Sequence, residues 1–220
     1  MEDNAQRLAL FPMGAVLLPS MLLPLHIFEQ RYRMLIAHCL DNGVPFGVVL
    51  SGSNGTRDIG CTARVERVLE RYDDGRMDIL CLGVTRFRIR STFNDSAWLS
   101  ADVDYLDAQN SAAAEGQNDD GLMQLARDTV KQLELYAAIV GGSIDRQALL
   151  QLGPHKLSYV AGASSMFSLE QKQSILELDS TAERLGLVRD TLINAIARRR
   201  MTRAARRVIG NEENIDHLLN

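Results

Sequence analysis

Hydrophobic and polar residues are distributed differently in the two halves of the chain. From residue 7 to residue 106, short apolar runs and every-second-residue alternation are separated by turn residues, a pattern typical of β-strands. From residue 121 to residue 207, apolar residues recur at spacings of three and four, which is typical of amphipathic helices. The polar stretch 107–120 has neither pattern and is predicted to be a linker, and residues 208–220 are predicted to form a tail.

The first half is predicted to contain several short strands and one helix. A strand over Leu8–Phe11 is expected to end at Pro12, and the prolines and glycine that follow, as far as Pro24, predict a long irregular loop. A helical pattern over Glu29–Leu40 is expected to stop at Gly43, since glycine tolerates a positive φ. Several short strands with one helix favour a small barrel-like or strongly curved sheet.

Local signals predict where individual elements bend, turn and begin. The inward-facing phase slips at Val68, which predicts a β-bulge near Glu66 and Arg67. The sequence Asp-Asp-Gly at 73–75 predicts a hairpin. In the second half, Asp145 is expected to cap a short helix, and Ser168 begins a capping-box pattern.

Composition places the chain among ordinary globular proteins. Apolar residues make up 46% and charged residues 24%, and no apolar run approaches the length of a membrane span. The residues Cys39, Cys61 and Cys81 are too widely spaced for a zinc or redox motif, and free thiols suit a reducing cytosol. Because the N-terminus lacks a basic region followed by an apolar one, we expect no secretory signal and a cytoplasmic location.

The sequence contains none of the motifs that mark the common enzyme classes. It has no Gly-Lys dipeptide for a phosphate-binding loop and no GxGxxG, HExxH, GxSxG or SxxK pattern. His38 beside Cys39 resembles a catalytic pair, but adjacent helical residues point about 100° apart. Asp73 and Asp74 are better explained as turn residues than as paired catalytic carboxylates. We therefore expect no catalysis, no cofactor and no metal.

Two groups of arginines raise the question of nucleic-acid binding. The net charge is −4, which disfavours a general polyanion binder. Arg64, Arg67, Arg86, Arg88 and Arg90 are predicted to form cross-strand ion pairs with Glu66, Asp102 and Asp104. The cluster from Arg198 to Arg207 is distributed around a helix and is interpreted as a solvated helix end.

One long stretch resembles a known family. LFPMG at 10–14, VLLP at 16–19 and LPLHIFEQRY at 23–32 resemble the start of the N-terminal, substrate-binding domain of Lon proteases, with Ser20 where that family has glycine. PFGVV at 45–49, IGCTA at 59–63, GVTRFRI at 83–89 and the helical residues 170–185 extend the similarity to about residues 7–200.

The resemblance implies an α+β fold in which a PUA-like β-barrel (a pseudobarrel) over 7–106 is followed by a helical bundle over 121–207. It also implies a non-catalytic module that binds protein or peptide segments and assists proteolysis or quality control. The ATPase and Ser–Lys peptidase motifs of Lon proteases are absent from these 220 residues. The alternatives are a PUA-like nucleic-acid binder and a small-molecule binder that uses a cleft between barrel and bundle.

The matched residues divide into a structural set and a candidate binding set. The structural set is Pro12, Gly14, Phe28, Glu29, Arg31, Tyr32, Phe46, Gly83, Arg86 and Phe87. The substrate-binding hypothesis names Leu18, Met21, Leu22, Leu23 and Pro24, because a proline-broken apolar loop cannot bury every side chain. We expect Leu18, Met21 and Leu22 to be partly exposed, and Leu10, Phe28 and Tyr32 to be buried.

The substrate-binding hypothesis predicts two kinds of partner. They are unfolded or peptide-like protein segments, together with a protease or chaperone that would act on them. A homodimer contact through the same apolar loop, and packing of that loop between barrel and bundle, are the competing interpretations. Nucleic acid and membranes are disfavoured as partners.

Overall fold

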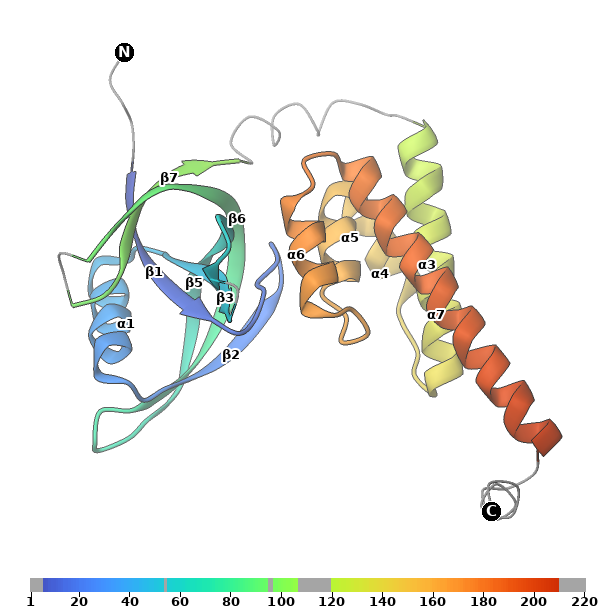
Figure 1. The fold of residues 1–220 in the computed structure, drawn as a ribbon, viewed down its shortest axis with the longest axis horizontal. Helices are drawn as coiled ribbons and strands as arrows, with labels where there is room; N and C mark the ends of the chain where they lie inside the picture. Colours follow the sequence, from blue (N-terminus) through green and yellow to red (C-terminus); the bar gives the residue numbers. More distant parts are fainter. Residues whose placement is uncertain (1–5, 54, 95–96, 107–119, 210–220) are drawn as a thin grey trace. The chain divides into compact units, whose positions relative to one another are not determined.

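The chain divides into two compact units. A computed structural model describes residues 6–53, 55–94, 97–106 and 120–209 (Figure 1). The first unit combines Met1–Asn118 with Ser158–Ser180, and the second combines Asp119–Leu157 with Thr181–Asn220. This division differs from the predicted one, since part of the expected helical bundle belongs to the barrel unit. All of the predicted linker except its last residue, and residues 210–220 of the predicted tail, lie outside the described residues.

The first unit is a ring of strands with a three-stranded extension, visible in Figure 1. The strands are β1 (Gln6–Met13), β2 (Leu22–Ile27), β3 (Phe46–Gly52), β4 (Gly55–Thr56), β5 (Ile59–Arg71), β6 (Met77–Phe93) and β7 (Ser100–Tyr105). The ring runs in the order β1-β7-β6-β5-β3, and parallel pairing of β1 with β3 closes it. The α+β fold with a ring-like sheet followed by helices is therefore confirmed.

The extension forms because β5 and β6 are longer than the ring requires. The first part of β6 lies between β2 and β5, and it pairs antiparallel with both strands. A register shift between Val65 and Arg67 confirms the predicted bulge, and Gly75 with φ 84° confirms the hairpin. The irregular loop predicted from Pro12 to Pro24 was wrong at both ends, because β1 continues through Met13 and residues Leu22–Ile27 form strand β2.

The helix α1 (Gln30–Asn42) follows β2 directly. It buries Tyr32, Leu35, Ile36 and Cys39, and it ends at Gly43 in the left-handed conformation that the sequence predicts. Its start agrees with the predicted helix to within one residue.

The core inside the closed sheet depends on two glycines that face the side chain of one phenylalanine. Phe87 is fully buried with Leu8, Leu10, Val49, Ala101 and Val103. A Cβ atom at Gly47 would lie 2.7 Å from Cζ of Phe87, and one at Gly60 would lie 2.6 Å from the same atom. Both strands therefore need glycine where they pass the Phe87 ring.

The helix α6 (Leu169–Glu177) belongs to the barrel unit because a buried arginine binds its C-terminal end. Arg86 is fully buried and donates to the carbonyl oxygens of Leu176 and Leu178 at 2.9 and 2.8 Å. It also pairs with the carboxylate of Asp179 at 3.1 Å. Gln173 donates to the carbonyl of Ile59 on β5 at 3.0 Å. Through these bonds the segment Ser158–Ser180 is attached to the strands of the first unit.

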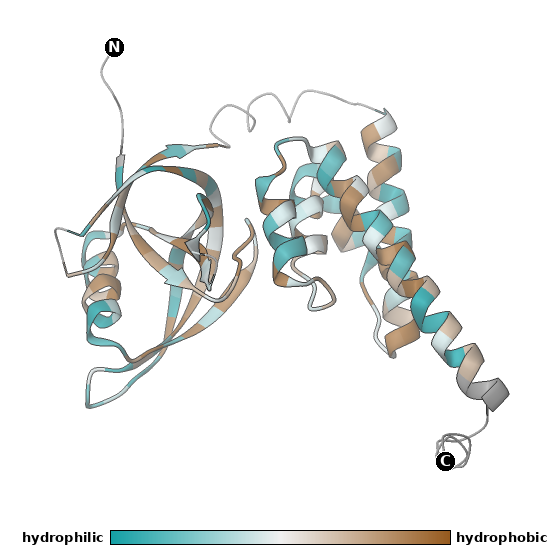
Figure 2. Cartoon of the chain, in the orientation of Figure 1, coloured by the Kyte–Doolittle hydropathy of each residue, from teal (hydrophilic) through white to brown (hydrophobic). Residues whose placement is uncertain are grey.

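The second unit is built on two long helices. It contains α3 (Asp120–Val140), α4 (Arg146–Gln151), the first part of α5 (Gly153–Gly162) and α7 (Thr181–Ile209). Figure 2 shows hydrophilic and hydrophobic segments alternating along α3 and α7, as amphipathic helices require. The predicted cap at Asp145 and the capping box at Ser168 are confirmed, the latter at the start of α6 in the first unit.

Candidate functional site

The apolar stretch before β2 begins with a buried turn. Val16, Leu17 and Leu18 are all at most 3% exposed. A Cβ atom at Gly83 would lie only 2.2 Å from the carbonyl oxygen of Leu18, so the turn lies directly on the backbone of β6. The expectation that Leu18 is partly exposed was wrong, because this close contact places it in the core.

The turn ends in a conformation that is unusual for serine. Ser20 has a φ of 64°, the one positive value among the described residues that are not glycine. Its amide donates to the carbonyl of Gly83 at 2.8 Å, and the amide of Met21 donates back to Leu18 at 3.1 Å. A side chain is strained in this left-handed region, where glycine is not.

Beyond this turn the chain comes to the surface as β2. Leu22 is 55% exposed, Pro24 is exposed, and Met21 and Leu23 are half-buried. Four of the five residues in the binding hypothesis therefore reach the surface of the barrel unit.

The register of β2 on β6 determines which backbone groups are free. The amide of Gly83 donates to the carbonyl of Met21 at 2.9 Å, and the register continues with Leu22 opposite Leu82 and Pro24 opposite Leu80. Because bonded and non-bonded pairs alternate in antiparallel sheets, Leu22, Pro24 and His26 occupy non-bonded positions. Pro24 fits there because it has no N–H to donate.

The solvent face of the extension carries an apolar stripe. Facing residues across β2, β6 and β5 form the rows Leu22–Leu82–Arg64, Pro24–Leu80–Arg67 and His26–Asp78–Glu70. The leucines on β6 are half-buried, whereas Arg64 and Arg67 beside them are exposed. Apolar groups bordered by charged ones are typical of protein-binding surfaces.

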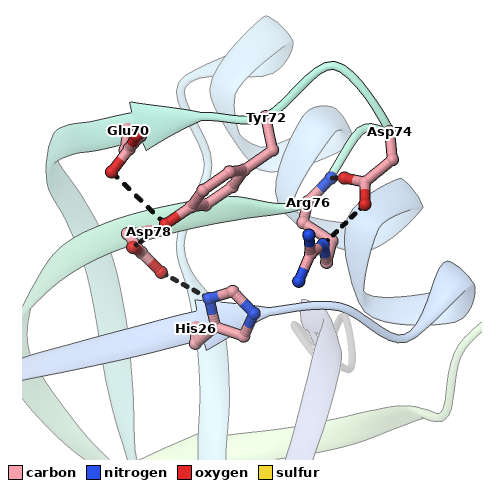
Figure 3. A network of polar contacts seen from close by, with 6 residues as sticks. All are labelled: His26, Glu70, Tyr72, Asp74, Arg76 and Asp78. Atoms are coloured by element: carbon pink, nitrogen blue, oxygen red, sulfur yellow. Dashed lines mark hydrogen bonds and ion pairs between the residues drawn. The ribbon is translucent and has the colours of Figure 1, made fainter.

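The third row forms a polar network at one end of the stripe (Figure 3). Nδ1 of His26 lies 2.6 Å from the carboxylate of Asp78, and the hydroxyl of Tyr72 donates to the same carboxylate at 2.8 Å. These bonds lower the pKa of Asp78. The bond to Asp78, with desolvation and the nearby charge of Glu70, raises the pKa of Tyr72 to about 12. The network holds the imidazole of His26 in place at the end of β2.

Phe28 lies just beyond this network on the surface. It is 60% exposed, and its ring stacks with that of His26 at a centroid distance of 6.0 Å. The prediction that Phe28 is buried was wrong, because β2 ends at Ile27 and the next residues turn into α1. Leu10 and Tyr32 are buried as predicted.

The surface was only partly visible in the sequence. His26, Tyr72, Asp78, Leu80 and Leu82 were missed. The one available signal was Asp78, a single charge within the otherwise apolar run 77–83. The long separation between β2 and β6 hides the rest.

A family model described as the "ATP-dependent protease La (LON) substrate-binding domain" matches residues 7–194. The chain belongs to the Lon substrate-binding domain family. It is 26% identical over 195 residues to a Lon protease from Paraburkholderia phytofirmans, covering 83% of the chain and 23% of that relative. It is 24% identical over 182 residues to Lon protease of Escherichia coli (strain K12), covering 77% of the chain and 22% of the relative. The chain thus spans less than a quarter of these relatives.

Solved structures of Lon N-terminal domains share the fold. A Lon N-terminal domain protein from Xanthomonas campestris superposes with a TM-score of 0.58 and 23% identity, covering 82% of the chain and 95% of that structure. The N-terminal domain of a Mycobacterium avium complex Lon protease superposes with a TM-score of 0.64 and 18% identity, covering 85% of the chain and 98% of that structure.

The residues shared with the Lon motif LPL-IFE-RY run from β2 into the start of α1, with four of them on the strand and Arg31 and Tyr32 on the helix. The ring of Tyr32 stacks on Phe11 at 3.9 Å, and its hydroxyl contacts the carbonyl of Pro12 at 3.4 Å. Glu29 is the N-cap residue of the helix, but its side chain makes no capping bond, and its carboxylate pairs instead with Arg31 at 2.8 Å. Of the remaining motif positions, Phe46 is buried beside Phe11, at 5.9 Å between rings, and Gly14 is exposed.

The arginines of the Lon-like barrel do not form one basic stripe. Arg64 binds Glu66, Arg90 binds Asp104, and Arg7 lies 3.7 Å from Asp102. The predicted cross-strand pairing is thus confirmed for Arg90 and Asp104, whereas Arg64 and Glu66 pair within β5 and Asp102 has Arg7, an arginine outside the prediction, as its partner. Arg86 departs from the prediction, because its side chain points away from solvent and binds the end of α6.

The candidate catalytic groups do not come together. Cys39 is buried, which raises the pKa of its thiol to about 11, while His38 is exposed and contacts Asn42. Within the described ranges, no three His, Cys, Asp or Glu side chains gather as a metal site would require. Among the helices that the structure describes, none has the length and apolar character of a membrane span.

Proposed function

We propose that this Lon-type domain binds unfolded or peptide-like protein segments, and that it does so at the surface of β2. Met21, Leu22, Leu23 and Pro24 supply the apolar contacts, and Leu80 and Leu82 extend them across β6. The single observation that supports this best is Leu22, which is 55% exposed at the edge of the stripe bordered by Arg64 and Arg67. Leu18 is not part of this proposal, because it is buried.

The proposal is consistent with a substrate-recognition module that performs no chemistry itself. We further infer that bound segments pass to a protease or chaperone in the cytoplasm. The three cysteines, all free and buried, suit that compartment. Nucleic-acid binding has little support, since Arg7, Arg64 and Arg90 pair with carboxylates and Arg86 is buried.

The test is a paired substitution on the full chain. Met21 and Leu22 are changed together to serine, and affinity for a fluorescent, reduced and carboxymethylated lactalbumin is measured by anisotropy. Losing contact with two apolar side chains should weaken binding by roughly tenfold or more. The melting temperature should change by no more than about 2 °C, because neither side chain is fully buried.

A matched control separates the site from general surface hydrophobicity. Leu135 on α3 is 37% exposed and lies in the second unit. Leu135→Ser should leave the affinity unchanged. Equal affinity of the Met21/Leu22 variant and the wild type would overturn the proposed site.

A further inference from the structure

Strand β2 is an edge strand. Within the described part of the chain it pairs with β6 alone, and the register assigns the outward backbone groups to Leu22, Pro24 and His26. Unpaired N–H and C=O groups in a row are a template for another extended chain.

From this edge we propose that the domain binds its protein segments by strand addition, as an extra antiparallel strand along β2. This rests on the proposed function and specifies its substrate class, which is an extended, unpaired stretch of polypeptide backbone. Main-chain bonds would provide affinity for many sequences, and alternate side chains would provide selectivity.

The hydrogen-bond pattern along the edge is incomplete at its centre. An incoming strand can exchange both bonds with Leu22 and both with His26. At Pro24 it can donate to the carbonyl but receives no N–H in return. The ends of β2 therefore hold the ligand, and its centre holds it more weakly.

Pro24 also argues against a second copy of this chain as the occupant. If two β2 edges pair with each other, each copy brings a proline and the ladder loses a donor from both sides. A client segment with an ordinary amide loses a donor from one side only. Proline at an edge is a known defence against edge-to-edge pairing. The edge thus favours foreign strands over its own duplicate.

The side chains around the edge indicate which strands fit best. Ligand residues directly opposite Leu22, Pro24 and His26 lie on the same face as those residues. They meet the exposed leucine at one end and the stacked rings of His26 and Phe28 at the other. The preferred segment therefore carries aliphatic or aromatic residues at every second position.

The decisive experiment uses backbone-modified peptides and the full chain. The parent probe is a fluorescein-labelled peptide Lys-Thr-Leu-Thr-Phe-Lys-Leu-Thr-Lys, and each variant carries a single N-methyl group with all side chains retained. Methylation at one set of alternate positions should weaken binding by more than roughly tenfold, since it removes a bond and obstructs the ladder. Methylation at the intervening positions should change affinity by less than about twofold.

Two protein variants locate the strand. Pro24→Thr restores the missing donor and should tighten binding by roughly fivefold, the value of one additional hydrogen bond. It should also increase self-association in sedimentation, because the defence against self-pairing is gone. Thr56→Pro, on the short strand β4, is the control at another edge and should leave peptide affinity unchanged.

Each outcome has a defined meaning. Equal affinity of all methylated peptides, with the parent still bound, overturns strand addition and leaves the proposed function standing. If neither the parent peptide nor unfolded lactalbumin binds, strand addition and the proposed function are both overturned. An alternating methylation pattern with unchanged affinity in Pro24→Thr excludes β2 as the docking edge. Wild-type dimers that the peptide cannot dissociate would make a second copy the occupant and overturn the proposal.

Discussion

Two neighbouring stretches of this chain are equally apolar in sequence but opposite in the structure. Residues 16–19 are buried against the backbone of β6, whereas residues 21–24 lie at or near the surface. The difference arises at Ser20, where a left-handed residue redirects the chain. Hydropathy measures how much a side chain gains from burial. It does not show which of two adjacent stretches finds a partner.

The largest expected effect distinguishes the two stretches directly. Leu18→Ala should lower the free energy of unfolding by about 3 kcal/mol, since it leaves a cavity in a packed core. Leu22→Ala should lower it by no more than about 0.5 kcal/mol, because the side chain is mostly solvated. Urea denaturation of both variants measures the contrast, and equal losses would contradict it.

The close approach under the turn provides a second test. Gly83→Ala places a Cβ atom 2.2 Å from the carbonyl oxygen of Leu18, so the turn must move. We expect a loss of about 3 kcal/mol, at the upper end of ordinary overpacking. Gly14→Ala is the matched control, because no atom lies within 4 Å of its Cβ position and its φ is not positive. Thermal unfolding that is equally affected by both changes would argue against the contact.

The two faces of β6 extend the comparison to pH. Burial, with a smaller contribution from Cys39, raises the pKa of Cys81 from 9.0 to about 12. Between these values the unfolded chain has released the proton and the folded chain has kept it. Stability is therefore complete below pH 9 and falls as the pH rises toward 12, by up to about 1.4 kcal/mol per unit for this thiol.

On the solvent face of β6, Asp78 should make stability depend on pH in the acid range. The pKa of Asp78 is lowered by its bonds to His26 and Tyr72, so its contribution is present above the unfolded value and is lost in acid. Urea midpoints of unfolding measured from pH 3 to pH 11 test both effects. Cys81→Ala should reduce only the loss of stability at alkaline pH, and Asp78→Asn should reduce only the loss at acid pH. The reverse pattern would refute these roles for the two residues.

The smallest effect concerns the residue that separates the two stretches. Ser20→Gly removes the strain of a side chain at φ 64° but adds freedom to the unfolded chain. The two contributions nearly offset each other, and we expect a net gain of about 0.5 kcal/mol. Calorimetry should show a slightly higher melting temperature, and a clear decrease would mean that the serine side chain is needed there.

Much of the local structure could be predicted because it depends on neighbouring residues. The bulge near Arg67, the hairpin at Gly75, the helix ending at Gly43 and the cap at Asp145 follow from residue type and spacing over a few positions. The resemblance of residues 10–32 to the Lon family added the overall architecture, which the family model and the solved folds confirm.

The candidate surface was less accessible, because its parts are distant in the chain. Leu22 meets Leu82, and His26 meets Asp78, only through the pairing of β2 with β6. Prolines at 19 and 24 concealed that strand, since proline disfavours a ladder unless its missing N–H faces a free edge. The prediction of a surface ion pair for Arg86 was wrong for a similar reason. Its partners lie more than eighty positions away, in α6 and at the C-terminal end of that helix.

By itself, the sequence determined the class of most elements, β2 excepted, together with several of the turns that separate them and the family of the chain. These depend on short-range preferences for φ, hydrogen bonding and spacing, which act within a few residues. Only the tertiary structure decided that Leu18 is core and Leu22 surface, and that β2, among the described residues, pairs along one side only. Burial and strand register are set by partners distant in the chain, and no local pattern specifies them.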